Sequence, residues 1–246
     1  MYILAIETTG AAASAALINE EGIVTFQESA ERLNHLQTLM IMTEKLLRES
    51  KLSIGDITCI AVSEGPGSFT GIRIGVSTAR ALGQALNLET ISVPTLKAFA
   101  YNLEGYKGIV CPLFDARRDQ VYAGAYQWNE KTTEVLEIVK GDAILIQELF
   151  EKLEKVASGQ EILFFGDGIK AYESQISRWT EMMNGKGVKV VLAAENIRFQ
   201  KASSVARLGL ELWNQNKTTD FEGLKPVYMR KPEAQRKLEE GSLKNV

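Results

Sequence analysis

The turn Glu7-Thr8-Thr9-Gly10 carries the first residues that could do chemistry. A carboxylate at the end of an apolar strand, followed by hydroxyls and a glycine, can hold a phosphate through backbone N–H groups and its Mg²⁺ through the carboxylate. The same residues also suit a tight hairpin whose Glu7 side chain is simply solvated. The spacing favours the hairpin and leaves a cofactor contact through Glu7 and Thr8 open.

A glycine-rich loop, Gly65–Gly71, lies between a predicted strand and a predicted helix. N–H groups at the start of that helix could face an anion, with Gly67 and Ser68 as the contact residues. The loop is not a P-loop, which ends in GK[ST], because here an isoleucine and Arg73 follow the last glycine. Ser68 or Thr70 suits the helix cap. A crossover that holds strand and helix close together explains the glycines equally well.

A second glycine-containing turn, Gly166-Asp167-Gly168, stands after a predicted strand and before a predicted helix. In a nucleotide-binding fold such a turn would contact a phosphate or a ribose. A strand–helix turn capped by Asp167 explains the same residues, and the pattern favours this second interpretation.

The single histidine and the two cysteines limit the chemistry. A zinc or iron site built on HxxxH or HExxH needs two imidazoles, and His35 has no second one to pair with, so a metallopeptidase is disfavoured. Cys59 and Cys111 lie in apolar runs without CxxC spacing, which predicts buried, reduced thiols. No GxSxG elbow marks a serine hydrolase. We expect no catalytic residue and no metal ligand, and we place His35 on a surface or an interface.

The composition is typical of a soluble globular protein, with 45% hydrophobic and 24% charged residues among 246. The net charge of −3 and the lack of a basic stripe predict that any contact with RNA is shared or indirect. No basic segment precedes the first apolar run, and no run approaches the ~18 apolar residues of a membrane span. We therefore expect a cytoplasmic protein without a membrane partner.

These residues are positioned by two successive halves that share one order of elements: a strand, an acidic turn, two strands, a helix, a strand and a helix. The first half is predicted to contain the strands Tyr2–Ile6, Ala12–Ile18, Ile23–Glu28, Ile57–Val62 and Glu89–Val93, and the helices Asn34–Ser50, Ile72–Leu86 and Pro94–Tyr101. The second half is predicted to contain the strands Gly108–Phe114, Val121–Trp128, Glu134–Val139, Ile162–Phe165 and Val188–Leu192, and the helices Ile144–Val156, Ile169–Thr180 and Ala202–Asn214. The repetition predicts an α/β fold with structurally similar subdomains at residues 1–104 and 105–225, and a solvated C-terminal extension at residues 226–246.

Two helices of the first half could pack against another protein. The helix Asn34–Ser50 is apolar on more than one side, and the helix Ile72–Leu86 carries small residues every four positions at Gly75, Ala79 and Gly83. Glycines destabilise a helix interior by about 1 kcal/mol each, which suggests a packing need. Packing inside the monomer would meet that need, but the wide apolar face favours a partner. The expected contact residues are His35, Leu36, Leu39, Met40, Thr43, Arg73, Val76, Ala79, Arg80 and Gly83.

Four segments stand out together: Ile3–Thr8, Gly65–Gly75, Asp115–Arg118 with Val121-Tyr122, and Pro226–Arg230. They resemble the TsaB family of tRNA threonylcarbamoyladenosine biosynthesis proteins, and the GPGSFTGxRxG pattern of the second segment is highly specific. The similarity spans nearly the whole chain and is thin from about residue 131 to residue 201. The family usually has aspartate where this chain has Glu7, and the longer side chain weakens the case for ordinary nucleotide binding at the first turn.

The resemblance implies a sugar kinase/Hsp70/actin-like (ribonuclease H-like) fold, with two similar subdomains of mixed sheets flanked by helices. It also implies cooperation with a catalytic paralogue, TsaD, and an ATPase, TsaE, in adding a threonylcarbamoyl group to adenosine 37 of tRNA. Family members pair through helices of the first subdomain, as homodimers or with the paralogue. By position, the resemblance assigns these contacts to the two helices named above, with tRNA reached only through the complex.

Two functions stay open at this point. The first is a non-catalytic subunit that binds and activates a TsaD-like protein together with a TsaE-like ATPase. The alternative is a free-standing actin-fold ATPase or small-molecule kinase that uses Glu7, Thr8 and both glycine turns around Mg-ATP. We expect little activity from the chain alone and no cofactor beyond weak nucleotide binding at Glu7, Thr8, Gly67 and Ser68.

Overall fold

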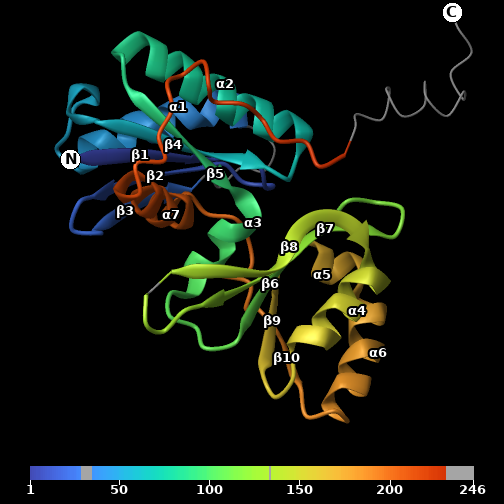
Figure 1. The fold of residues 1–246 in the computed structure, drawn as a ribbon. Helices are drawn as coiled ribbons and strands as arrows, with labels where there is room; N and C mark the ends of the chain where they lie inside the picture. Colours follow the sequence, from blue (N-terminus) through green and yellow to red (C-terminus); the bar gives the residue numbers. More distant parts are fainter. Residues whose placement is uncertain (29–34, 133, 231–246) are drawn as a thin grey trace, which may run out of the picture.

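The computed structural model describes residues 1–28, 35–132 and 134–230. The side chains of His35 and Leu36 and the predicted helix cap Asn34 lie outside the described residues. The chain forms two subdomains, each built on a five-stranded mixed sheet (Figure 1). No helix in the described part of the chain has the length and apolarity to cross a membrane.

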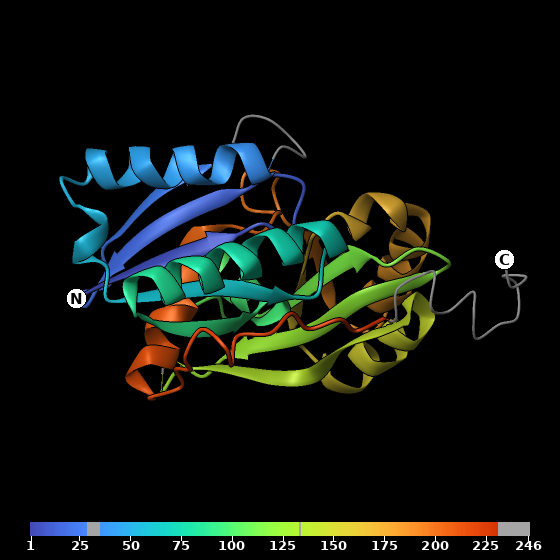
Figure 2. The same cartoon turned by 90° about the horizontal axis from the view of Figure 1, so that it is seen from above.

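The first sheet has the strand order β3-β2-β1-β4-β5. The strand β1 pairs antiparallel with β2 and parallel with β4, β2 pairs antiparallel with β3, and β4 pairs parallel with β5. The bounds are β1 Tyr2–Glu7, β2 Ser14–Asn19, β3 Val24–Glu28, β4 Cys59–Gly65 and β5 Glu89–Pro94. Two helices, α1 His35–Glu49 and α2 Phe69–Leu86, cover one face, and a short 3-10 turn, η1 Ile54–Asp56, leads into β4 (Figure 2).

The second sheet has the order β10-β9-β6-β7-β8. Its strands are β6 Ile109–Asp115, β7 Gln120–Trp128, β8 Val135–Leu145, β9 Glu161–Phe165 and β10 Lys189–Leu192. One face packs against α4 Ile146–Val156, α5 Gly168–Ala171 and α6 Glu173–Asn184. Read from β8 to β10, this sheet repeats the first strand for strand, so the predicted repetition of one plan in two similar subdomains is confirmed.

The two faces of β1 belong to different parts of the core. Leu4 and Ile6 pack with residues of α1 and α2, whereas Ile3 and Ala5 pack with residues of the last helix, α7 Ala202–Asn214. This alternation follows because successive side chains of a strand point to opposite faces of the sheet. Both faces of the first sheet are therefore buried.

The position of α7 differs from the predicted division of the chain. Residues 105–225 were expected to form the second subdomain, but α7 contacts β1, β2, β4 and β5 of the first. Its buried residues include Val205, Leu208 and Gly209, and a Cβ added at Gly209 would lie 2.9 Å from the Cβ of Ala61. The helix returns to the first sheet because that face, left open by α1 and α2, needs a cover.

A short connection, α3 Thr95–Ala98 and the 3-10 turn η2 Phe99–Leu103, joins the subdomains. The Phe99 ring lies 5.3 Å from that of Phe114 and 5.7 Å from that of Phe165, both in the second sheet. Since Phe99 also belongs to the cluster that contains α7, one hydrophobic core runs through both subdomains.

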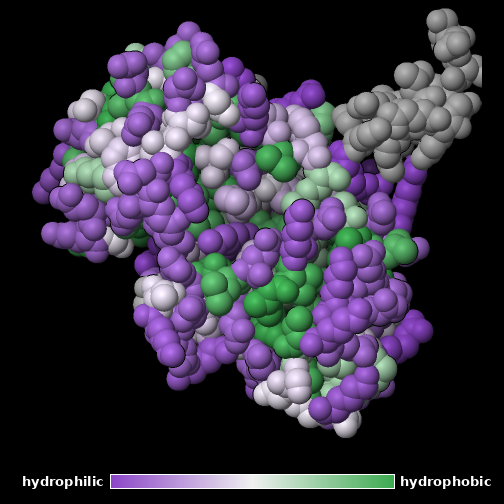
Figure 3. All heavy atoms as spheres, in the orientation of Figure 1, coloured by the Kyte–Doolittle hydropathy of each residue, from purple (hydrophilic) through white to green (hydrophobic). Residues whose placement is uncertain are grey.

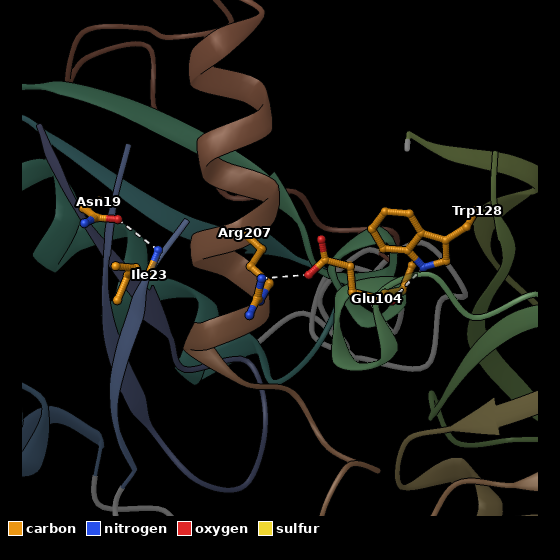
Figure 4. A network of polar contacts seen from close by, with 6 residues as sticks. Asn19, Ile23, Glu104, Trp128 and Arg207 are labelled. Atoms are coloured by element: carbon orange, nitrogen blue, oxygen red, sulfur yellow. Dashed lines mark hydrogen bonds and ion pairs between the residues drawn. The ribbon is translucent and has the colours of Figure 1, made fainter. Parts of the chain in front are cut away.

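Polar contacts hold the same connection in place (Figure 4). The indole Nε1–H of Trp128 donates to the carbonyl of Ala100 at 3.1 Å, and Arg207 of α7 pairs with Glu104 at 2.7 Å. The connection is thus anchored to β7 on one side and to α7 on the other.

Candidate functional site

The turn after β1 is closed by its own side chains. Glu7 is 1% exposed, and its Oε1 accepts the Thr9 N–H at 2.5 Å and the Thr9 hydroxyl at 2.6 Å. Its Oε2 accepts the hydroxyl of Ser63 in β4. The backbone N–H expected to meet a phosphate therefore binds the chain's own carboxylate. Glu7 is also not the solvated hairpin residue that the turn pattern favoured.

Burial sets the electrostatics of this carboxyl. It raises the pKa of Glu7 above the ordinary value, and the hydrogen bonds from Ser63 and Thr9 oppose the rise. A charged group without solvent is disfavoured unless its partners compensate. Glu7 therefore contributes to the structure of the turn, where three donors satisfy it.

The glycine-rich loop packs directly on that turn. A Cβ added at Gly67 would lie 2.6 Å from the Cβ of Thr9, closer than real Cβ atoms approach. Cβ atoms at Gly71 and Gly75 would overlap the carbonyl and the hydroxyl of Thr8. The Thr8 hydroxyl itself donates to the Gly71 carbonyl at 2.8 Å. These three glycines are thus required by close contact within the chain.

Ser68 begins α2 as one of its two predicted caps. Its Oγ accepts the N–H of Gly71 at 3.2 Å, and its own N–H donates to the Thr9 carbonyl at 2.8 Å. The helix starts at Phe69, three residues earlier than predicted, because the Ser68 side chain satisfies a backbone N–H of the first helical turn. Glu7, Thr8, Gly67 and Ser68, expected to contact a cofactor, all hold the turn and the loop together.

A cavity of about 460 Å³ lies beside this turn, where the subdomains meet. Its volume is within the range of pockets that bind small molecules. It is lined by Gly10, Ala11, Ala12 and Glu28 of the first subdomain and by Gly166, Asp167, Lys170, Glu195, Arg198, Phe199 and Gln200. None of the four expected cofactor contacts is among these residues, whereas the second glycine turn is.

Charges of both signs surround the cavity. Lys170 and Arg198 provide the positive charges, and Arg198 is steadied by an Nε–H donated to the Ala193 carbonyl at 2.9 Å. Sequence reasoning missed both cations. Lys170 lies three residues after Asp167, so its position near the second glycine turn could have been predicted. Arg198 lies in an irregular segment whose sequence has no recognisable pattern.

Asp167 connects the cavity to the turn after β6. Its Oδ1 accepts the Asp115 N–H at 3.2 Å across the ends of two parallel strands. Desolvation raises the pKa of Asp167, and the charge of Asp115 adds to the rise. Asp167 directly precedes α5, but its side chain makes no capping hydrogen bond, so the predicted capping role is wrong. Its carboxylate instead ties together two loops at the sheet edge.

The predicted partner residues divide into buried and exposed groups. Leu39, Thr43, Val76, Ala79 and Gly83 are buried inside the first subdomain. Met40 is 46% exposed, Arg73 and Arg80 are exposed, and Ile41, which the expected set left out, is 67% exposed. Only the exposed residues can touch another protein directly, because the buried ones fill the chain's own core.

The small-residue strip on α2 is occupied within the monomer. A Cβ at Gly83 would lie 3.0 Å from the Thr90 side chain and 3.2 Å from that of Phe221. Gly75 meets Thr8, and Ala79 is 0% exposed. The intramolecular alternative accounts for these glycines, so the expected close approach of a partner helix along this strip is corrected.

Exposed apolar side chains also occur away from α1. Leu136, Leu145, Met182 and Leu192 of the second subdomain are 43 to 50% exposed. Figure 3 shows hydrophobic residues gathered on this subdomain, while polar residues cover most of the first on the same side. The apolar surface is therefore not confined to the face predicted from the sequence.

The two thiols are buried, as predicted. Cys59 and Cys111 are both free and 0% exposed. Burial raises the pKa of Cys59 to about 12 and raises that of Cys111 further. In the described part of the chain, no group of three or more His, Cys, Asp and Glu residues is arranged to hold a metal ion.

Comparison with known proteins gives consistent matches over the whole chain. Residues 20–237 match the family described as TsaD: tRNA N6-adenosine threonylcarbamoyltransferase. The chain is 31% identical to the tRNA threonylcarbamoyladenosine biosynthesis protein TsaB of Bacillus subtilis, covering 96% of this chain and 97% of that protein. It is also 31% identical to TsaB of Escherichia coli, with coverages of 97% and 98%.

Solved structures agree with these relatives. YeaZ from Pseudomonas aeruginosa is similar with a TM-score of 0.73 and 26% identity, covering 92% of this chain and 99% of that chain. A second Pseudomonas aeruginosa structure, described as an uncharacterized protein with similarity to peptidase YEAZ, gives a TM-score of 0.74 at 26% identity and covers 93% and 99%.

Proposed function

Because the chain belongs to the TsaB family, within the wider TsaD family, we propose that it is a non-catalytic subunit in the synthesis of threonylcarbamoyladenosine at position 37 of tRNA. In this proposal it binds and activates a TsaD-like paralogue in the cytoplasm, together with a TsaE-like ATPase. It reaches tRNA only through the complex, in keeping with its net charge of −3.

The closed Glu7 turn is the observation that carries the proposal. An actin-like fold that processes a nucleotide needs a carboxylate free to meet a metal ion or its waters. Here three donors occupy the Glu7 carboxylate, and the glycine-rich loop packs on the turn. A chain built in this way is better suited to supporting a catalytic partner than to catalysis.

The proposed partner surface is the exposed side of α1 and α2. It presents Met40 and Ile41 as apolar contacts and Arg73 and Arg80 as charged ones. Apolar side chains this exposed favour a protein partner, and the same surface would make a homodimer when the paralogue is missing. His35 and Leu36, at the start of α1, stay part of the proposal by position.

Mixing the chain with a purified TsaD-like subunit tests this surface. We expect Ile41→Asp to weaken the complex at least about tenfold, because interface cores tolerate charge poorly, and to lower tRNA modification in the reconstituted reaction. Leu192→Asp is the matched control, since it charges an equally apolar exposed position in the second subdomain. Equal binding by both variants, or no complex with the unaltered chain, would contradict the proposal.

A free-standing ATPase or small-molecule kinase is the second candidate, favoured by the cavity with Lys170 and Arg198 in its wall. Calorimetry with Mg-ATP separates the two, because a free-standing enzyme should bind at micromolar concentration, or roughly −8 kcal/mol. Absence of heat at millimolar nucleotide would remove this candidate.

A further inference from the structure

The segment after α7 forms a strap, which we define as residues 218–230. It runs back along the first subdomain toward the second, and is drawn in red in Figures 1 and 2. Its first part adds to the edge of the first sheet, where Thr90 and Thr219 exchange both backbone hydrogen bonds at 2.7 and 2.9 Å. Leu224 is 0% exposed and belongs to the core under α1 and α2. The strap is therefore a fixed part of the first subdomain.

The far end of the strap is fixed at the start of α2. The Val227 N–H donates to the Glu64 carbonyl at 2.8 Å. The Tyr228 ring lies 4.8 Å from that of Phe69, and its hydroxyl accepts the Nε–H of Arg73 at 2.9 Å. The guanidinium of Arg73 also lies 4.0 Å over the Phe69 ring, a cation–π contact. The beginning of the predicted solvated extension is thus packed, although residues 231–246 lie outside the described part of the chain.

Arg230 then crosses to the second subdomain. Its Nη1–H donates to the carbonyl of Ala116, in the turn that follows β6. The charge of Arg230 also reaches the neighbourhood of Tyr172, whose pKa is raised to about 12 by burial and by Asp115, and Arg230 opposes that rise. Within the described residues, the strap is therefore bonded to both subdomains.

The turn that Arg230 reaches is continuous with the cavity wall. Asp115, the residue before Ala116, donates its N–H to Asp167, and Asp167 lines the cavity from the second subdomain. The opposite wall is Gly10–Ala12, which follows β1 of the first subdomain. The contact between Arg230 and Ala116 therefore lies next to the residue whose N–H binds the cavity wall.

We propose that Arg230 is a latch, which holds the turn after β6 against the strap and so sets the separation of the subdomains across the cavity. The three parts of the latch come from segments that carry the family resemblance: Gly65–Gly75, Asp115–Arg118 and Pro226–Arg230. Because the three segments meet at one place, each contributes contacts to the proposed latch. The inference does not depend on which partner the chain binds.

Distance measurement between spin labels tests the latch. Glu20 and Lys155 are exposed and lie in different subdomains, so a double variant Glu20→Cys, Lys155→Cys reports their separation. Cys59 and Cys111 are 0% exposed and stay unlabelled in the folded chain. We expect Arg230→Met to broaden the distance distribution. Lys225→Met removes an equal charge from an exposed position of the strap and should leave the distribution unchanged.

Two truncations and one local measurement complete the test. Removal of residues 227–246 should act like Arg230→Met, whereas removal of residues 231–246 should act like the unaltered chain. Hydrogen exchange at the Gln120 amide, which closes the same turn by donating to Arg117, should accelerate about tenfold in Arg230→Met. Unchanged distances and exchange in Arg230→Met would overturn the proposal, and so would a change that only the longer truncation produces.

Discussion

The variant Glu7→Gln tests whether ionisation of the buried Glu7 carboxyl lowers the free energy of unfolding. The glutamine amide oxygen can still accept from the N–H and the hydroxyl of Thr9, and its NH₂ group can donate to the Ser63 oxygen with little change in shape. The substitution therefore removes the charge and keeps the hydrogen bonds. Glu7→Ala is the contrasting variant, because it leaves the same donors buried without an acceptor and should cost about 3 kcal/mol or more.

The pH dependence of Glu7→Gln has a definite sign. The pKa of Glu7 is raised in the folded chain above its ordinary value of 4.5, so the unfolded chain releases this proton first as the pH rises. Wild-type stability from this group is present below pH 4.5 and is lost as the pH rises through the folded pKa. Each unit between the two pKa values corresponds to about 1.4 kcal/mol. The glutamine variant should thus gain stability over wild type as the pH rises from 4.5 toward 8.

Urea unfolding of both proteins between pH 4 and pH 8 measures this difference. Comparing the variant with wild type at each pH cancels the titration of groups that the two proteins share. The difference should be small at the acid end and should grow as the pH rises. A difference that moves the opposite way would show that the folded chain favours the ionised carboxylate, and the account of the closed turn would be wrong.

Two further predictions concern packing. Gly75→Ala should destabilise the chain by about 1–3 kcal/mol in thermal unfolding, because the added methyl group overlaps a buried threonine hydroxyl. The control Gly55→Ala, whose Cβ would have only an ordinary 3.7 Å contact, should change stability by less than about 0.5 kcal/mol. Equal effects of the two variants would contradict the packing argument. Cys59 and Cys111 should resist a thiol reagent such as DTNB in the folded chain and should both react after unfolding, because burial removes access and raises the pKa of each thiol; rapid reaction of either at pH 8 without unfolding would refute this.

The strands were predictable because their apolar runs are short and are bounded by turn residues. The first strand was expected at Tyr2–Ile6 and forms Tyr2–Glu7. The third strand of the second half was expected at Glu134–Val139, but β8 extends to Leu145. The added residues have an apolar pattern that also fits the start of a helix. They form a strand instead because they pair with β7. Local pattern thus locates an element more reliably than it locates its end.

The site was less predictable because its contacts are distant in sequence. Ser63, which satisfies Glu7, is 56 residues away, and nothing in the turn itself indicates which donors will reach the carboxylate. The glycines of α2 correctly indicated a close approach, but spacing cannot say whether a partner helix or Thr8 makes it. In the same way, the apolar face of α7 predicts that this face is buried, but it does not indicate which of the two sheets covers it.

The closed Glu7 turn and the cavity beside it together limit which residues a bound ligand would contact. A small molecule in the cavity would meet Lys170, Arg198 and the Gly166-Asp167 turn, all from the second subdomain or the segment that follows it. It would not meet Glu7, whose oxygens are taken by Thr9 and Ser63. The group best placed to orient a metal ion for phosphate chemistry is therefore separated from the place where a ligand fits. A ligand in the cavity would touch residues of both subdomains, which are the parts that Arg230 is proposed to hold together.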